Sequence, residues 1–387
     1  MLYDKLKVYT ESGMYPMHMP GHKRNAEYMP PGFPFDIDIT EIHGFDDLND
    51  PQGVLLEATK LAAEVYGSLD AFMLVNGSTV GILAAIGAHT KRGDKILACS
   101  NCHRSTPNAA ELFGLELVYV KPRVDRASGV ACSITPASIG SALEANPDIK
   151  LVIITSPTYE GVVSDVAAIS DVVHGAGLPL IVDSAHGAHL GFSDAFPKSA
   201  IALGADVVVV SLHKTLSALT QCSLLHVCSE RADTEGIKRL LSILQTSSPS
   251  YVLMASIDHC LRLLKSDKDQ LFNDYERNLI HFSNRVMDVN NMTVLCHGRD
   301  SLHPGFFDFD TGKIVVVTKN TALSGMALAY ILRDEYMVEI ERVYNNYIIA
   351  MTGVCDRPEG IVRLADALCA IDAGPYVMGF RGHIMGD

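Results

Sequence analysis

Short apolar runs recur along the first two thirds of the chain, separated by segments of helical or loop character. The runs predict strands at residues 71–75, 95–98, 117–120, 151–155, 180–183 and 207–211. The last three begin 29 (180 minus 151) and 27 (207 minus 180) residues apart, about the length of one strand–helix crossover unit. Because such runs are almost continuously apolar, helices should cover both faces of the sheet. The pattern predicts an α/β fold with a doubly wound, mostly parallel sheet.

The remainder of the chain predicts a smaller second domain. A helical pattern around residues 249–264 leads out of the sheet region. It is followed by patterns for a strand at 313–318, a helix at 324–336, a strand at 347–352 and a helix at 358–370. We therefore expect four parts: an N-terminal segment (1–45), a large α/β domain (46–265), a small α+β domain (266–374) and a tail (375–387).

Composition narrows the class of protein. The 387 residues are 48% hydrophobic and 20% charged, which is typical of a globular chain. With 31 basic against 45 acidic residues, binding to nucleic acid or to an anionic membrane surface is disfavoured. No apolar run approaches the roughly 20 residues of a spanning helix, and the start has no signal-peptide pattern, so we expect a cytoplasmic protein. The one Cys-x-x-Cys pair, Cys99 and Cys102, lacks a second pair at zinc-site spacing, so no metal site is expected.

Polar residues follow five of the predicted strands. In an open α/β sheet the ligand lies beyond the carboxyl ends of the strands, so these residues are the ones to consider for binding or catalysis. We expect them to converge on one rim of the sheet. They form the segments 76–79, 100–105, 156–161, 183–189 and 211–215.

Lys214 and Asp183 are the most informative of these residues. A lysine directly after a buried strand is a candidate nucleophile toward an aldehyde, because burial lowers the pKa of its amine. Asp183 ends the preceding strand, so a carboxylate is expected beside the lysine. Pyridoxal 5'-phosphate (PLP) requires such a pair, with the acid keeping the pyridine nitrogen protonated. The alternatives are a surface lysine and an aspartate that caps a helix.

Other rim residues suggest an anion site. The segment 76–79 supplies a glycine, backbone N–H groups and two hydroxyls at a predicted helix start, which suits a phosphate but also an ordinary helix cap. Ser211 and His213 could add phosphate contacts, and His103 could stack on a flat ring or be a half-buried histidine. The dinucleotide, P-loop, α/β-hydrolase and zincin motifs are absent from the sequence.

Seven motifs in order resemble the major domain of the Orn/Lys/Arg decarboxylases, which belong to the aspartate-aminotransferase-like, fold-type I PLP enzymes. The resemblance extends from about residue 1 to 370. The motifs are MPGHK (19–23), NGST (76–79), NCHRS (101–105), SPTYEG (156–161), DSAHGAH (183–189), SLHKTLSALTQ (211–221) and TSSPSYVLMAS (246–256).

The resemblance implies a role for each matching residue. Lys214 would hold PLP covalently, Asp183 would pair with the pyridine nitrogen, and His103 would stack on the ring. His186 would lie near the ring and Asp183. On chemical grounds, Lys214 or His213 could return a proton to Cα of the substrate. The phosphate would be bound by Gly77, Ser78, Thr79, Ser211 and His213. The MPGHK segment lies near the active site in the family, without an assigned role for His22 or Lys23, and a homodimer is implied.

The sequence departs from the family at its C-terminal end, where relatives carry a further domain that helps to close the active site. The chain is therefore expected to be a short form. Arg363 could clamp a carboxylate, but its place in an ordinary helix pattern favours a surface position. Glu160 is a weak candidate for binding the distal amine of the substrate.

The expected function is decarboxylation of lysine, ornithine or arginine. Two alternatives remain open at this point. One is another PLP reaction, catalysed by an aminotransferase or a lyase, because the fold alone does not fix the reaction. The other is a catalytically weak paralogue that regulates a decarboxylase partner.

Overall fold

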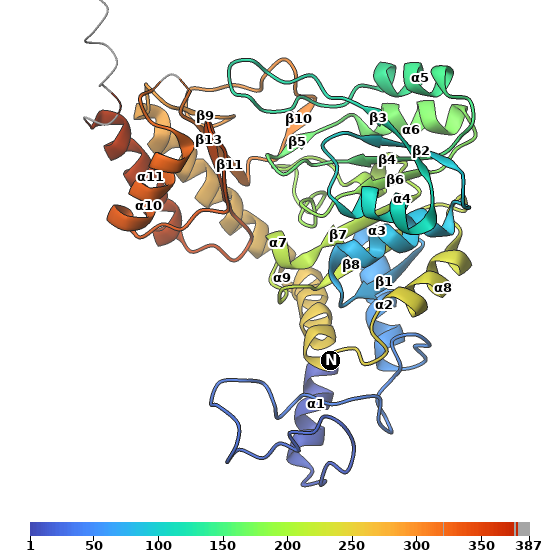
Figure 1. The fold of residues 1–387 in the computed structure, drawn as a ribbon. Coiled ribbons are helices and arrows are strands. Elements are labelled where there is room, and N and C mark those ends of the chain that lie inside the picture. The colour runs from blue at the N-terminus through green and yellow to red at the C-terminus, as the bar shows by residue number, and fades with distance from the viewer. Residues whose placement is uncertain (320, 375–376, 378–387) are drawn as a thin grey trace, which may run out of the picture.

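A seven-stranded sheet forms the centre of the computed structural model, which describes residues 1–319, 321–374 and 377. The strand order is β1-β8-β7-β6-β4-β2-β3 (Figure 1). All six predicted strands form, and the pairs among β2, β3, β4, β6 and β7 are parallel, so the predicted mostly parallel sheet is confirmed. The strands are β1 (Asp70–Leu74), β2 (Lys95–Cys99), β3 (Glu116–Val120), β4 (Ile149–Thr155), β6 (Leu180–Asp183), β7 (Val207–Ser211) and β8 (Ser223–Val227).

Strand β8 was not predicted. It pairs antiparallel with both β1 and β7, and Ser223 lies opposite Ser211. Only the short helix α7 (Leu212–Thr215) and a turn separate it from β7, whereas the prediction relied on the longer spacing of strand–helix crossovers. All five β8 residues are buried, so its sequence has no alternation of buried and exposed positions that would reveal a strand.

Helices cover both faces of the sheet, as predicted. Adjacent residues of β7 point to opposite faces: Val207 belongs to one apolar core and Val208 to another. The core containing Val207 also includes residues of α3 (Gly77–Ala88), α4 (Ser105–Phe113) and α8 (Thr234–Leu244). The core containing Val208 includes residues of α2 (Val54–Tyr66), α5 (Pro136–Ala145), α6 (Val166–Gly175) and α9 (Tyr251–Arg285).

Helix α9 leads from the sheet to a second, smaller unit. It is longer than predicted because buried positions recur at helical spacing beyond residue 264, at Phe272, Tyr275, Leu279 and Phe282. Its backbone is non-helical at Asp267, close to the predicted domain boundary after residue 265.

The second unit has a four-stranded sheet in the order β12-β13-β11-β9. The predicted strands and helices of this region all form. The elements are β9 (Thr293–Val294), β11 (Lys313–Val317), β12 (Arg342–Val343), β13 (Tyr347–Met351), α10 (Gly325–Tyr336), α11 (Pro358–Ala373) and the 3-10 turn η2 (Val286–Asp288). Another 3-10 turn, η1 (Ala200–Leu203), lies in the large unit. Of the predicted tail, residues 375–376 and 378–387 lie outside the described residues.

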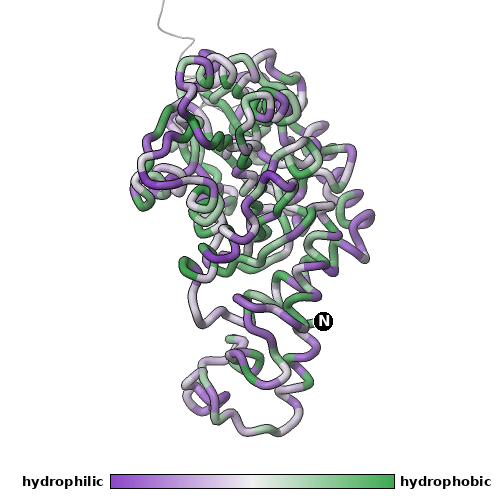
Figure 2. The backbone as a smooth tube through the Cα atoms, turned by 90° about the vertical axis from the view of Figure 1, so that its right-hand side faces the viewer, coloured by the Kyte–Doolittle hydropathy of each residue, from purple (hydrophilic) through white to green (hydrophobic). Residues whose placement is uncertain are grey.

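Two further features join these parts. Strand β10 (Asp308–Phe309) pairs with β5 (Val162–Val163), which ties the chain before β11 to the loop after β4. Helix α1 (Leu2–Glu11) packs against α9, and the loops that follow α1 extend away from the body of the molecule (Figures 1 and 2). Among the described residues, no helix is long and apolar enough to cross a membrane.

Candidate active site

Lys214 lies in α7, directly after the central strand β7. Its side chain is half-buried, and its Nζ lies 3.0 Å from Nε2 of His186. Burial lowers the pKa of Lys214, and the negative charge of Asp183 opposes this effect without cancelling it. A lowered pKa increases the fraction of neutral amine, which is the nucleophilic form.

Asp183 is the last residue of β6, beside the last residue of β4 and near the end of β7. It lies in register with Thr155 of β4 and Val209 of β7. The side chain is almost fully buried, and its Oδ1 accepts a hydrogen bond from the backbone N–H of Ala185. Burial raises the pKa of Asp183, while the positive charge of Lys214 partly offsets the increase. Such a carboxylate favours a protonated nitrogen at its side, because that nitrogen would compensate its buried charge.

His186 connects Lys214 to the loop after β4. Burial and the charge of Lys214 hold the pKa of His186 well below its usual value, so the imidazole is neutral. Its ring packs against Tyr159, with the two ring centroids 4.5 Å apart. The Tyr159 hydroxyl donates a hydrogen bond to the carboxylate of Glu341 in the small unit. Contacts therefore run from Lys214 across the large domain to the small one.

Two further histidines, His103 and His213, belong to the rim. His103 follows β2 on an exposed loop, where its Nδ1 lies 2.9 Å from Oγ of Ser105. His213 donates from Nδ1 to the backbone carbonyl of Cys222, at 3.0 Å. Because burial lowers the pKa of His213, its ring is a neutral group whose second nitrogen can exchange a proton.

The start of α3 has the features of an anion site. Asn76, at the N-cap position, makes no side-chain capping hydrogen bond. Gly77 has a φ of 73°, a left-handed conformation that glycine adopts without strain. Ser211 Oγ at the end of β7 donates to Ser78 Oγ at 3.1 Å, which joins the two strand ends, and Thr79 is exposed beside them.

The structure thus brings the predicted rim residues together. Hydrogen bonds and ring contacts link the loops after β1, β4, β6 and β7, and His103, after β2, is close enough for its charge to affect the pKa of Asp183. The sequence did not predict that Tyr159, in the SPTYEG motif (156–161), packs against His186. It also missed Glu341, 182 positions away, for which no local signal exists.

Residues with weaker predictions lie elsewhere or have other partners. Arg363 is exposed on α11, in agreement with a surface position. Glu160 accepts a hydrogen bond from the Tyr347 hydroxyl at 3.0 Å. His22 and Lys23 contact Asp38 and His18, within the N-terminal segment.

Cys99 and Cys102 remain thiols in this environment. Burial raises the pKa of Cys99 to about 12 and also raises that of Cys102, so neither is a reactive thiolate. Within the described ranges, no group of three or more histidine, cysteine, aspartate or glutamate side chains could hold a metal ion.

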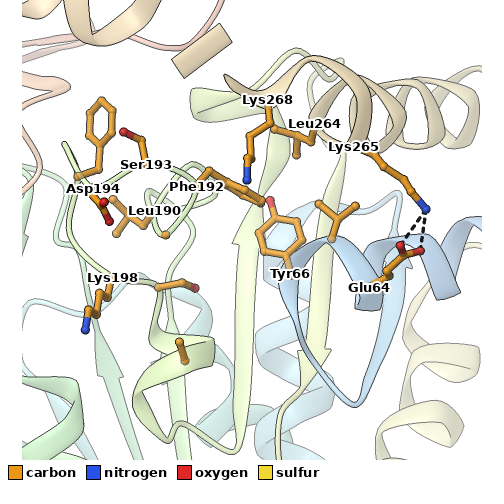
Figure 3. A pocket seen from close by; sticks show the side chains of 15 residues that line it. Glu64, Tyr66, Leu190, Phe192, Ser193, Asp194, Lys198, Leu264, Lys265 and Lys268 are labelled. Atoms are coloured by element: carbon orange, nitrogen blue, oxygen red, sulfur yellow. Dashed lines mark hydrogen bonds and ion pairs between the residues drawn. The ribbon is translucent and has the colours of Figure 1, made fainter. Parts of the chain in front are cut away.

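A separate cavity of about 470 Å³ lies between the end of α2 and the middle of α9 (Figure 3). Tyr66, Phe192 and Lys268 line it, together with the ion pair of Lys265 and Glu64. Its lining does not include Lys214, Asp183 or the start of α3. The candidate active site is therefore the rim of the sheet, where the reactive side chains meet.

The rim fits the cofactor that the resemblance implies. A PLP molecule needs an amine for its aldehyde, an acid for its pyridine nitrogen and donors for its phosphate. Lys214, Asp183 and the first turn of α3 match these three needs. In addition, two buried atoms at the rim, His186 Nδ1 and Thr155 Oγ1, have no hydrogen-bond partner among the described residues, as expected for groups that face a ligand.

Comparison of the sequence with known proteins identifies related chains. Arginine decarboxylase of Bacillus subtilis is 32% identical over 381 residues, which is 96% of this chain and 76% of that protein. The uncharacterized protein YaaO of the same organism is 44% identical over 263 residues, 66% of this chain and 55% of YaaO. The chain therefore spans little more than half the length of YaaO.

Solved structures share the fold. The constitutive lysine decarboxylase of Escherichia coli superimposes with a TM-score of 0.78 at 20% identity, over 95% of this chain and 59% of the other. Alanine–glyoxylate aminotransferase from Nostoc sp. superimposes with a TM-score of 0.66 at 16% identity, over 84% of this chain and 88% of the other. At these identities the likeness establishes a shared fold, which confirms the predicted aminotransferase-like architecture.

The model of one protein family, described as the major domain of Orn/Lys/Arg decarboxylases, matches residues 1–315. This match covers most of the chain and includes every rim residue predicted from the sequence. The ordered motifs, the geometry of the rim and the relatives all agree with it. The chain belongs to the Orn/Lys/Arg decarboxylase family.

Proposed function

We propose that the chain is a PLP-dependent decarboxylase that converts lysine, ornithine or arginine to the corresponding amine. The observation that carries the proposal is the half-buried Lys214, in contact with His186 and beside the buried Asp183 at the end of the next strand. Decarboxylases of arginine and lysine among the relatives support a basic amino acid as the substrate.

Each rim residue has a distinct task in this proposal. PLP bound there supplies an electron sink for the bond between Cα and the substrate carboxyl group. Lys214 would hold the cofactor covalently, and Asp183 would keep a proton at the pyridine nitrogen. His103, which is exposed at the same rim, would cover one face of the ring. In its protonated form, Lys214 or His213 would be a strong proton donor toward Cα, because both have lowered pKa values.

Two carboxylates, one in the small unit and one on the loop after β4 that faces it, support the proposal of a cationic substrate. Glu341 accepts a hydrogen bond from Tyr159, whose ring packs on His186. Glu160, on the same loop as Tyr159, accepts one from Tyr347. Each carboxylate keeps lone pairs beyond its tyrosine partner, so each can also accept a hydrogen bond from an ammonium or guanidinium group.

Product analysis tests the proposed reaction. The full chain, supplied with PLP, is incubated separately with lysine, ornithine, arginine and the uncharged control norleucine. We expect carbon dioxide and the matching amine from at least one basic amino acid and neither product from norleucine. Keto acid without carbon dioxide would instead identify an aminotransferase. Bound PLP without turnover of any substrate would favour the regulatory paralogue.

We also propose a homodimer in which a second copy covers the N-terminal segment. Large apolar side chains of this segment are exposed, among them Val8, Met14, Tyr15, Met17, Tyr28 and Phe33. A patch of this kind on a projecting segment is typical of an interaction surface. Light scattering of the purified chain should give twice its mass of 41.9 kDa. A monomer at micromolar concentration would contradict the dimer.

A cytoplasmic location is proposed as well. All nine cysteines are free thiols, which suits a reducing compartment. Cell fractionation with antibody detection tests this location, and recovery of the protein in an extracytoplasmic fraction would contradict it.

A further inference from the structure

A loop of the small unit contacts the residue that follows Lys214. This loop, residues 352–357, connects β13 to α11. The backbone N–H of Val354 donates to the carbonyl of Thr215, at 3.1 Å. The side chain of Val354 is buried in the apolar core that also contains Val208 of β7. The small unit therefore inserts a side chain into the core of the large unit and bonds the last residue of α7.

The turn that carries Lys214 depends on contacts of this kind. Helix α7 is a single turn, which is too short to be stable by itself. The last carbonyls of a helix have no partner within it, and Val354 provides one for the carbonyl of Thr215. On the other side of Lys214, the backbone N–H of His213 donates to the carbonyl of Cys222, at 3.4 Å. Lys214 therefore lies between two residues whose backbones are held, one by the large unit and one by the small unit.

Gly353 leaves no space between the loop and α7. A Cβ at this position would lie 2.9 Å from the carbonyl oxygen of Thr215 and 3.4 Å from its Cα. Both are backbone atoms, so a side chain here could be accommodated only by displacing the segment that carries Lys214. Gly353 does not have a positive φ, so its backbone conformation does not require glycine. The close contact with Thr215 does.

The loop is also fixed on the side away from α7. Oδ2 of Asp356 accepts a hydrogen bond from the backbone N–H of Gly353, at 2.8 Å. Asn278 of α9 donates to the carbonyl of Asp356, at 3.2 Å. The hydroxyl of the buried Thr352 lies 2.8 Å from that of Tyr275, also on α9. These bonds oppose movement of the loop away from α7.

We propose that Gly353 is a positioning residue, through which the loop of the small unit sets the position of α7 and of the amine of Lys214. The inference rests on the proposed function in one respect, namely that Lys214 reacts with PLP. Nζ of Lys214 lies 3.0 Å from Nε2 of His186, and displacement of Thr215 would move the amine relative to this partner. Misplacement of a reacting group by about 1 Å can lower a rate by about a hundredfold.

The first measurement needs no cofactor. Amide hydrogen exchange of the full chain, read by mass spectrometry of overlapping peptides, compares Gly353→Ala with the wild type. We expect exchange at residues 212–216 to become about tenfold faster, because the turn is no longer held in place, while β7 and β8 keep their wild-type rates. The matched control is Gly360→Ala in α11, where a Cβ would meet no atom within 4 Å, and it should leave exchange unchanged. Unchanged exchange in Gly353→Ala, or an equal increase across β7 and β8, would overturn the inference.

The second measurement separates positioning of Lys214 from a general defect in packing. The rate of covalent attachment of PLP, followed by absorbance, reports the position of the amine. The affinity for pyridoxine 5'-phosphate, an alcohol that forms no bond to a lysine, reports the rest of the cofactor site. Gly353→Ala should slow attachment by about tenfold, as expected for a displacement smaller than 1 Å, and keep the affinity for the alcohol. Equal losses of both would show a packing role and contradict the inference.

A milder variant guards against loss of the fold in Gly353→Ala. Asp356→Ala removes the acceptor for the N–H of Gly353 and adds no atom against Thr215. It should give the same pattern with smaller changes. If Gly353→Ala does not fold, wild-type exchange and attachment in Asp356→Ala would overturn the inference. Failure of wild-type Lys214 to bind PLP would refute the proposed function, and the exchange measurement would still decide whether the loop positions α7.

Discussion

Lys214→Ala is expected to abolish covalent attachment of PLP and to lower decarboxylation by about four orders of magnitude or more, as loss of a nucleophile does in other enzymes. The reason is that the amine of Lys214 is the proposed nucleophile, and it lies 3.0 Å from His186 in a partly desolvated position. Three measurements check this result: absorbance of the bound cofactor, borohydride trapping followed by mass spectrometry of residue 214, and release of carbon dioxide.

The matched control for this variant is Lys91→Ala, at an exposed lysine before β2, which should keep both attachment and activity. Thermal unfolding of Lys214→Ala should show a modest loss of stability relative to the control, because the buried Asp183 loses the positive charge that partly offsets its burial. Trapping of PLP on a lysine other than Lys214 in the wild-type chain would refute the assignment.

Asp183→Asn is expected to lower kcat by about a hundredfold to a thousandfold while PLP stays attached, a loss typical of removing a preorganised electrostatic partner. An amide cannot stabilise a proton on the pyridine nitrogen as a buried carboxylate does, so the cofactor becomes a weaker electron sink. The pH dependence of the spectrum of bound PLP reports this change independently of turnover.

Asp206→Asn is the control, because Asp206 is a buried aspartate directly before β7 of the same sheet. Asp206 is fully buried and bonds His174 and the backbone N–H of Leu180. Its replacement should lower stability but leave kcat of the folded protein unchanged. Equal effects of the two substitutions on kcat would mean that Asp183 supports the fold rather than the cofactor.

Strands and the residues at their ends could be predicted from the local sequence pattern. Pairings between segments far apart in the sequence could not. Continuous apolar runs were enough to place six strands and, through the rule for parallel sheets, to gather Lys214, Asp183 and residues 76–79 on one rim. Strand β8 was missed because it returns antiparallel after a short connection.

The contribution of the small unit to the site was also missed. His189 and Asp310 are 121 positions apart, and Tyr159 and Glu341 are 182 apart. Their pairing depends on how the second unit packs against the first, and no periodicity or motif in a single sequence encodes it.

The antiparallel return of β8 has a consequence for motion. Lys214 lies in the connection between β7 and β8. These two strands pair along their whole length, from Ser211–Ser223 to Val207–Val227, and β7 also pairs with β6. The amine of Lys214 therefore extends from a hairpin whose two strands are both held inside the sheet. On the neighbouring loops, Tyr159 bonds Glu341 and His189 bonds Asp310, both in the other unit. We therefore expect Lys214 to keep its position while substrate enters and product leaves. The loops that carry Tyr159 and His186 would be the parts that move.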